Sequence, residues 1–451
     1  MILRGGLLAL PGEEHGVVGD VRISQGRIVE IGEDLADDGA VMDARGLVVL
    51  PGGIDSHVHF NDPGYTSRED FYCGTCAAAA GGITTVVDMP CTSVPPGTSR
   101  VHLMEKLAVV KRKAVVDFGF FGGVSGQSYQ DAVGPGMAEM APSVWGFKTY
   151  LTSGMKTFER LNHWQFRSCL ERAAEVRRPV LVHAEDFDYV QAATAACTRR
   201  GDSPRLFYQS RPETAENIAV AAAVEMAEET GASLHVVHVG SARAAALVRD
   251  RAASGRITCE TAPHYLNFDV EDFVALGAPL KVTPPVKAPE NRASLWRFLA
   301  EGSIAFVASD HAPCQDKDKK TGSIWTDYSG IPGTGTLMPY LFSEGYLAGR
   351  LSLGRLAEVT SGAAARRYGV AERKGALAPG RDADLALFDP GRPGVVSGAL
   401  FPSKGKITPF EGMTLRGTLV ATFLRGEMVF HRDRGVVAPP GTGRFVTPAG
   451  A

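Results

Sequence analysis

The chain has 451 residues, 44% hydrophobic and 22% charged, which allows a large buried core and is typical of a globular protein. Its formal net charge of −3 gives no strong field of one sign, so we expect a small, roughly neutral partner and neither nucleic acid nor a membrane surface. Seven cysteines, the absence of a recognisable signal segment and the absence of a run of about 20 apolar residues predict a cytoplasmic protein with reduced thiols and exclude a disulfide scaffold.

Three regions with different patterns follow one another along the chain. Residues 1–50 alternate as short strands do, with glycine and aspartate turns between them. From 51 to 374, short β-rich runs are each followed by a longer helical stretch. From 375 to 451 the strand pattern returns, and the tail after Val436 is rich in Pro, Gly and Thr, which favours the surface. We therefore predict an α/β protein in which residues 1–50 and 375–451 form one small β-sandwich domain beside a barrel.

The middle region, residues 51–374, predicts a (β/α)₈ TIM barrel. Its candidate strands lie at 53–59, 83–89, 115–121, 144–149, 180–183, 233–238, 257–260 and 304–309. Roughly 250 or more residues of such units is the usual size of this barrel. Because the chemistry of a TIM barrel lies at the C-terminal ends of its strands, we expect functional side chains there.

His57 and His59 end the first of these strands. A spacing of two places both imidazoles on one face of a strand, which suits chelation of a metal by two nitrogens. A His-x-His pair also arises by chance, so its position at a strand end is what favours ligation.

Three more candidate ligands end apolar strands: His183, His238 and Asp310. His235 and His238 are three residues apart and point to opposite faces of their strand, so only one of them can face the barrel mouth. We choose His238, which is nearer the C-terminal end, and interpret His235 as a core residue or a support for the ligands.

Lys148 ends another predicted strand. Taken alone, a lysine there is more simply a side chain that carries its charge to the surface. In a site that holds cations, carboxylation of its amine by CO₂ would turn it into a bridging anion, and partly buried lysines of low pKa are able to react in this way. We therefore predict a CO₂-derived carbamate on Lys148.

These residues make one set of candidate metal ligands: His57, His59, Lys148, His183, His238 and Asp310. Four nitrogens and two oxygen-donor groups suit a pair of divalent ions such as Zn²⁺. Two ions about 3.5–4 Å apart can activate a shared water and polarise a carbonyl. Asp310 is then the expected catalytic residue, as a proton carrier.

Longer motifs around these residues resemble the cyclic amidohydrolases of the amidohydrolase superfamily, the group of dihydroorotases, hydantoinases and allantoinases. They are PGGIDSHVHF at 51–60, AAGGITTVVDMP at 79–90, GFK at 146–148, VHAE at 182–185, HVVHV at 235–239, APHYL at 262–266 and SDHAP at 309–313. The resemblance runs almost end to end. It implies a TIM barrel with a small β domain, two metals, a carbamate on Lys148 and a homo-oligomer, by resemblance a tetramer.

Substrate-contact positions distinguish the branches of this group. Dihydroorotases carry an arginine two residues after the His-x-His motif, which pairs with the substrate carboxylate, where this chain has Asn61. Their Asn-Pro-Pro is Thr-Pro-Pro here, beginning at Thr283. Hydantoinases place a tyrosine five residues after the lysine, where this chain has Ser153. Allantoinases resemble the chain over 57–64, 210–213 and 260–266, although the segment 329–335 differs from theirs.

The resemblance therefore implies hydrolysis of a neutral cyclic ureide, first of all allantoin to allantoate. Neutral groups would bind this substrate: Asn61, Ser153, Thr283 and the backbone around Gly330. The alternatives are a dihydroorotase, a hydantoinase or dihydropyrimidinase-like enzyme, and a scaffold homologue without turnover. The complete ligand set argues against the scaffold.

Other features are interpreted without a function of their own. Cys73 and Cys76 have the spacing of a redox or zinc motif, but they lack a second pair. The glycine-rich segment 330–335 lacks the lysine and the preceding strand of a phosphate-binding loop. His264 and His311 lie beside ligand segments, and His264 is interpreted as a support for them.

Overall fold

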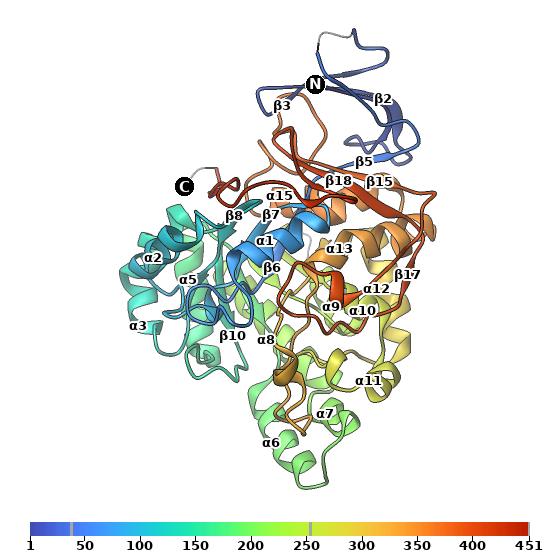
Figure 1. The fold of residues 1–451 in the computed structure, drawn as a ribbon. Helices are drawn as coiled ribbons and strands as arrows, with labels where there is room; N and C mark the ends of the chain where they lie inside the picture. The colour runs from blue at the N-terminus through green and yellow to red at the C-terminus, as the bar shows by residue number, and fades with distance from the viewer. Residues whose placement is uncertain (37–38, 252–254, 450–451) are drawn as a thin grey trace.

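The computed structural model describes residues 1–36, 39–251 and 255–449. A barrel occupies its centre, and a sheet that contains both ends of the chain lies against one end of the barrel, at the top of Figure 1. Helices α6 (Phe187–Thr198) and α7 (Pro204–Ser210) lie at the opposite end of the molecule.

The barrel is built from two parallel sheets, β6-β7-β8 and β9 to β14. Its strands are β6 Gly53–Val58, β7 Ile83–Asp88, β8 Asp117–Phe120, β9 Gly122–Gly123, β10 Phe147–Tyr150, β11 Val180–His183, β12 Leu234–Val236, β13 Ile257–Thr261 and β14 Phe306–Val307. Backbone hydrogen bonds link the two sheets, from Phe121 to the carbonyl of Asp88 (3.1 Å) and from His59 to the carbonyl of His311 (2.7 Å). The predicted barrel is confirmed; β8 lies within the expected strand 115–121, and β9 directly follows that range.

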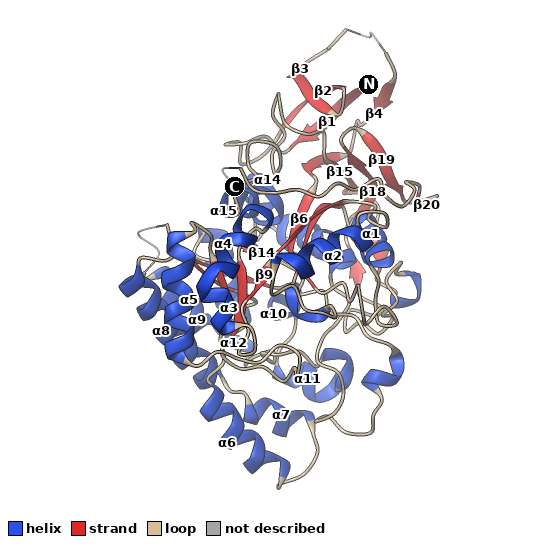
Figure 2. Cartoon of the chain, turned by 90° about the vertical axis from the view of Figure 1, so that its left-hand side faces the viewer, coloured by secondary structure: helices blue, strands red, loops and turns tan. Residues whose placement is uncertain are grey.

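Helices cover the outside of the barrel (Figure 2). Besides α6 and α7 they are α1 Phe71–Ala80, α2 Arg100–Val110, α3 Tyr129–Asp131, α4 Met137–Met140, α5 His163–Glu175, α8 Glu213–Thr230, α9 Ala242–Arg249, α10 Pro263–Asn267, α11 Val270–Leu276, α12 Pro289–Glu301, α13 Thr334–Tyr340, α14 Leu353–Ala357 and α15 Ala363–Arg367. Local sequence sets several ends. Asn162 and Gln165 form a capping box at the start of α5, and Gly231 ends α8 in a left-handed conformation.

Side chains fill the barrel rather than leaving a channel. Every residue of β7 and β11 is buried, as expected for parallel strands covered on both faces. Ile54, Leu181 and Phe306, from three different strands, meet in one buried cluster. This rigid interior fixes where the C-terminal end of each strand lies.

The sheet beside the barrel contains strands from both ends of the chain. Its strands are β1 Ile2–Leu8, β2 Val17–Ser24, β3 Arg27–Gly32, β4 Val41–Asp43, β5 Val48–Pro51, β15 Leu385–Asp389, β18 Thr418–Leu424, β19 Glu427–His431 and β20 Gly435–Val436. β5 and β15 pair antiparallel, with Leu385 opposite Pro51, so the two ends are joined as predicted. β16 (Gly394–Val395) and β17 (Thr414–Leu415) form a separate hairpin. We keep 1–50 and 375–451 as the proposed limits of this β domain.

The tail after Val436 lies on the surface, as its composition predicts, and part of it also packs against the barrel. The backbone of Phe118 in β8 donates to the carbonyl of Arg444 and accepts from Val446, at 2.9 and 2.8 Å. The indole nitrogen of Trp145 donates to the carbonyl of Val446 at 2.8 Å. Because Val446 is 3% exposed, the tail is part of the barrel's packing.

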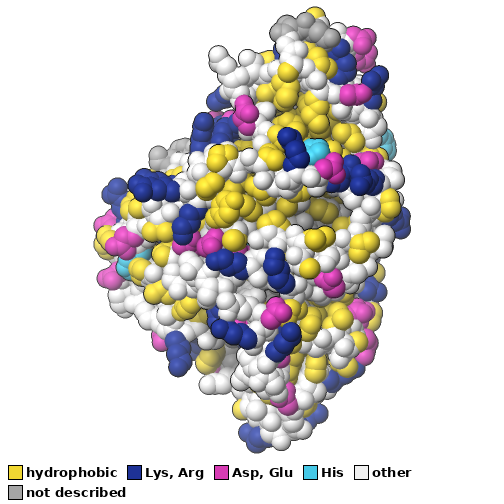
Figure 3. Space-filling model, in the orientation of Figure 1, with side chains coloured by type: hydrophobic (Ala, Val, Ile, Leu, Met, Phe, Trp, Pro, Cys, Tyr) yellow, Lys and Arg dark blue, Asp and Glu magenta, His cyan; other side chains and the backbone are white. Residues whose placement is uncertain are grey.

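The charged side chains on the surface shown in Figure 3 are mixed in sign, and the cysteines form no disulfide among the described residues. Lys and Arg side chains are interspersed with Asp and Glu on the face shown in Figure 3. All seven cysteines, from Cys73 to Cys314, are free thiols. Among the described helices, none has the length and apolarity that a membrane crossing requires.

Candidate metal centre

A cavity of about 550 Å³ opens at the C-terminal ends of the barrel strands, within the size range of small-molecule sites. Five of the six predicted ligands line it: His57, His59, His183, His238 and Asp310. Each extends from, or directly follows, a barrel strand. These candidate ligands therefore gather at the end of the barrel where the strand-end rule predicts them, and their role as ligands stays a prediction.

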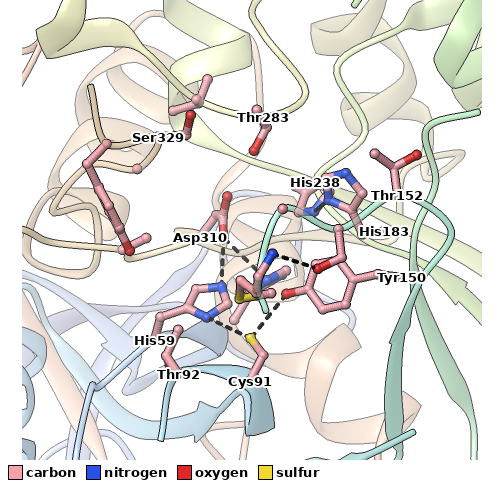
Figure 4. Close-up of a pocket in the computed structure, with 18 of the residues that line it drawn as sticks. His59, Cys91, Thr92, Tyr150, Thr152, His183, His238, Thr283, Asp310 and Ser329 are labelled. Carbon is pink, nitrogen blue, oxygen red and sulfur yellow. Dashed lines mark hydrogen bonds and ion pairs between the residues drawn. The ribbon is translucent and has the colours of Figure 1, made fainter. Parts of the chain in front are cut away.

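His57, His59 and Asp310 converge on one point. The Nε2 atoms of both histidines lie 3.3 Å from Oδ1 of Asp310. Figure 4 shows His59 and Asp310 facing each other. All three side chains are buried, and their donor atoms lie close enough together to hold one metal ion.

His183 and His238 form a second convergent pair. Nδ1 of His183 lies 3.0 Å from Nε2 of His238. His238 has φ +40° and Asp310 has φ +49°, a left-handed conformation uncommon for residues other than glycine. Such conformations persist where surrounding structure enforces them, and they cluster at functional sites.

Lys148 lies buried between these groups. Its side chain is fully buried, and Nζ has no hydrogen-bond partner among the described residues. Nζ lies 4.7 Å from the centre of the Tyr150 ring. Burial lowers the pKa of Lys148 to about 8, which increases the fraction of neutral amine near neutral pH.

The predicted substrate contacts are divided between the cavity and the protein interior. Ser153, Thr283 and Gly330 line the cavity. The Ser153 hydroxyl already donates to the carbonyl of Phe158 at 2.7 Å. Asn61 is fully buried and is not among the lining residues; its amide donates to the carbonyl of His59 at 3.1 Å. A glycine is required at Gly330, where φ is +147° and a Cβ would lie 2.5 Å from the carbonyl oxygen of Ala312.

Comparisons with known proteins agree with this geometry. A model of the Amidohydrolase family matches residues 48–429. The chain belongs to the amidohydrolase family. This amidohydrolase is 42% identical to an allantoinase of Rubrobacter xylanophilus over 456 residues, covering 99% of this chain and 97% of that protein. An allantoinase of Solibacter usitatus is 36% identical, covering 98% and 95%.

Solved structures show the same architecture. The L-hydantoinase (dihydropyrimidinase) from Arthrobacter aurescens superposes on this amidohydrolase with a TM-score of 0.94 and 30% identity, covering 99% of both chains. This similarity supports a TIM barrel with a small β domain. The family and the allantoinase relatives together indicate a hydrolase that acts on cyclic amides.

Two carboxylates that sequence reasoning left without a role support the candidate ligands of this amidohydrolase. Glu260 accepts a hydrogen bond from Nδ1 of His57 at 2.6 Å and lies 3.2 Å from Nε2 of His235. Glu185 lies 2.8 Å from Nε2 of His183 and 2.5 Å from Arg211. Burial opposes ionisation of Glu185, but Arg211 and His183 outweigh it and lower its pKa to about 2. Glu260 lies at the C-terminal end of β13 and Glu185 lies two residues after β11, so the strand-end rule could have found both.

Several other residues lie in or beside the cavity. Arg68, Cys91 and Tyr150 line the cavity. His235 is buried and stacked on Phe306, as expected for a core or supporting residue. His264 is buried with no partner for either ring nitrogen among the described residues, while Nδ1 of His311 accepts from the backbone of residue 333 at 3.1 Å.

A second group of carboxylates is a structural ion-pair network. Asp117, Asp382 and Asp384 also lie close enough to hold a metal. Lys374 already contacts all three, at 2.6, 3.1 and 2.6 Å, and Arg425 pairs with Asp117. These cations neutralise the cluster, which joins the beginning of β8 to the C-terminal strands.

Replacing Glu260 by glutamine is expected to weaken metal retention by about 10–100-fold, the usual effect of losing the carboxylate behind a metal-binding histidine. The change removes the charge that fixes the ring of His57. Metal content after dialysis against a chelator measures it. Glu216→Gln removes a buried carboxylate that pairs with Lys287 instead, so it is the matched control and should retain metal. Equal retention in the two variants would contradict the role of Glu260.

Proposed function

We propose that this amidohydrolase opens the ring of a neutral cyclic ureide, first of all allantoin, to give allantoate. The choice of allantoin as the substrate is supported by the similarity to two allantoinases, at 42% and 36% identity. This similarity extends over almost the whole chain. The chemistry rests on the histidines and Asp310 at the mouth of the barrel.

The donor groups fit a pair of divalent metal ions, and we propose Zn²⁺. His57, His59, Lys148, His183, His238 and Asp310 would hold them. Buried donor atoms without a hydrogen-bond partner, Nε2 of His57 and Nζ of Lys148, support this proposal, because leaving such groups unpaired is costly. When bound, the ions supply Lewis-acid activation of water and of the substrate carbonyl.

Lys148 would take part as a carbamate. Its neutral amine adds to CO₂, forming an N–C bond and losing one proton, so that a buried cation becomes an anion able to bridge two metals. Its burial and its lowered pKa support this proposal, since only the neutral amine reacts.

Asp310 would carry the proton. Burial opposes its ionisation, but the hydrogen bond with His59 and the charges of the nearby histidines outweigh it and lower its pKa to about 2. Asp310 is therefore ionised, and we propose that its carboxylate accepts a proton from the attacking water and returns it to the ring nitrogen as the C–N bond breaks. The products are a carboxylate and a free ureido N–H group.

The charge balance of the cavity supports a neutral substrate. Arg211 is paired with Glu185 at 2.5 Å, and Arg68 lies 3.7 Å from Asp318. Ser153, Thr283 and the backbone at Gly330 add neutral groups to the cavity wall. A carboxylate-bearing substrate would have to draw Arg68 or Arg211 from its own carboxylate partner or bind the exposed Lys156 at the cavity wall.

A hydantoinase-like activity is the second candidate, because the hydantoinase structure superposes with a TM-score of 0.94. A screen of the metal-loaded protein with allantoin, hydantoins, dihydrouracil and dihydroorotate separates the candidates. We expect the highest kcat/KM for allantoin. Turnover of dihydroorotate at least about tenfold more efficient than of any neutral ureide, a difference of about 1.4 kcal/mol, would overturn the proposal.

The same protein preparation tests the scaffold alternative and the assembly. We expect about two metal ions per chain, because the donor set is complete; far less metal together with no turnover would favour a scaffold. A homotetramer is implied by the resemblance alone and stays a prediction, which the mass of the purified protein in solution checks.

A further inference from the structure

Each histidine of the site has one ring nitrogen that points away from the proposed metals. The histidines differ in the group that contacts this nitrogen. For His57 this partner is the Glu260 carboxylate at 2.6 Å, and for His183 it is the Glu185 carboxylate at 2.8 Å. For His59 it is a thiol, because Nδ1 lies 3.6 Å from Sγ of Cys91. The thiol is the weakest of these partners.

Cys91 is held in place by one further contact. It lies in the 3₁₀ turn η1 (Pro90–Thr92), which directly follows β7, and it is 1% exposed. Its Sγ lies 3.1 Å from the hydroxyl of Tyr150 in β10. Figure 4 shows the resulting row, with Asp310, His59, Cys91 and Tyr150 in sequence.

Tyr150 ties this row to the rest of the site. Its ring stacks on His183, with the ring centres 5.3 Å apart, and packs against Nζ of Lys148. One side chain therefore touches two other candidate ligands and the thiol behind a third. A shift of Cys91 would therefore move His59 directly. A shift of Tyr150 would also change its contacts with His183 and Lys148.

We propose that Cys91, anchored by Tyr150, is a positioning residue that holds the His59 ring for metal binding. Nε2 of His59 faces Asp310 and is the nitrogen that a metal would take, so in the metal-bound protein Nδ1 would carry the ring proton and donate it to Sγ, while the thiol proton is free to point at the Tyr150 oxygen. A partner on the far nitrogen fixes the orientation and tautomer of a ligating histidine. This inference rests on the proposed metal site and does not depend on the substrate.

A weak partner holds His59 less firmly than the carboxylates hold His57 and His183, and Nδ1 of His238 has no partner among the described residues. Loss of the thiol leaves Nδ1 unpaired in a buried place, and the ring gains freedom to rotate or to change tautomer. The metal ion that uses His59 should then be held more weakly than in the wild type.

The test measures metal retention in Cys91→Ala against Cys169→Ala. Cys169 is also a fully buried free thiol, but it lies in α5 and away from the site, so the matched change controls for the loss of a buried sulfur. We expect Cys91→Ala to retain metal about 10–100-fold more weakly. Tyr150→Phe should weaken retention about two- to tenfold, the effect of one hydrogen bond. Cys91→Ser, which keeps a donor and an acceptor, should recover part of the loss.

A second readout needs no metal. In metal-free protein, ¹⁵N spectra of the histidine rings report the hydrogen bond at Nδ1 of His59, and we expect the Nδ1 signal to differ between the wild type and Cys91→Ala. Unchanged His59 signals, or equal metal retention in the Cys91 and Cys169 variants, would overturn the proposal. A wild-type protein that binds no metal but shows the expected change at His59 would instead count against the proposed function alone.

Discussion

Replacing Lys148 by alanine is expected to remove bound metal and activity together. Its amine lies fully buried, without a partner among the described residues, and only a carbamate there would supply an oxygen ligand to both ions. We expect turnover to fall by at least about 10²–10³-fold, the effect of losing one strong electrostatic contact at a transition state. Metal content and kcat, measured on the same sample, check this.

Short carboxylic acids provide the rescue. Because Lys148→Ala leaves a space where the carbamate stood, added acetate or propionate should restore part of both metal content and activity. Lys281→Ala is the matched control, since burial also lowers the pKa of Lys281 to about 8 but its amine donates to the backbone carbonyl of Asp327. That variant should retain metal. A free ammonium on Lys148 in metal-loaded crystals would refute the carbamate.

Asp310→Asn should keep the fold and slow turnover by about 10²–10⁴-fold, the usual contribution of a general acid or base. The amide has nearly the same shape as the carboxylate, but it cannot accept the proton that Asp310 is proposed to carry. The melting temperature and metal content report on the fold and the site, and kcat reports on the proton transfer.

Asp318→Asn is the control for Asp310. Asp318 lies near the cavity rim, where it is 3.7 Å from Arg68, and it touches none of the candidate ligands. Its loss should change kcat only slightly. Near wild-type turnover in Asp310→Asn would remove Asp310 from the mechanism, whereas a large effect in both variants would point to disturbed charge rather than proton transfer.

The sequence by itself determined the barrel, the joining of both termini in one sheet and the candidate ligands. These follow from short-range patterns, because side chains alternate along a strand and the C-terminal ends of the strands meet at one face of the barrel. His57 and His59 needed their spacing of two together with their position at the end of a strand. His238 was separated from His235 by the same alternation, and the structure places His238 beside His183.

Only the tertiary structure shows which side chains form hydrogen bonds with those ligands. Glu260 is 203 residues from His57, and Tyr150 is 59 residues from Cys91, so no local pattern links the partners. The same holds for Asn61, which motif comparison assigned to the substrate but which packs beneath the cavity. The packing of the tail against β8 was equally invisible in its composition. The physical reason is that strand patterns fix which face a side chain takes, whereas its partner depends on how neighbouring strands and loops meet across the barrel.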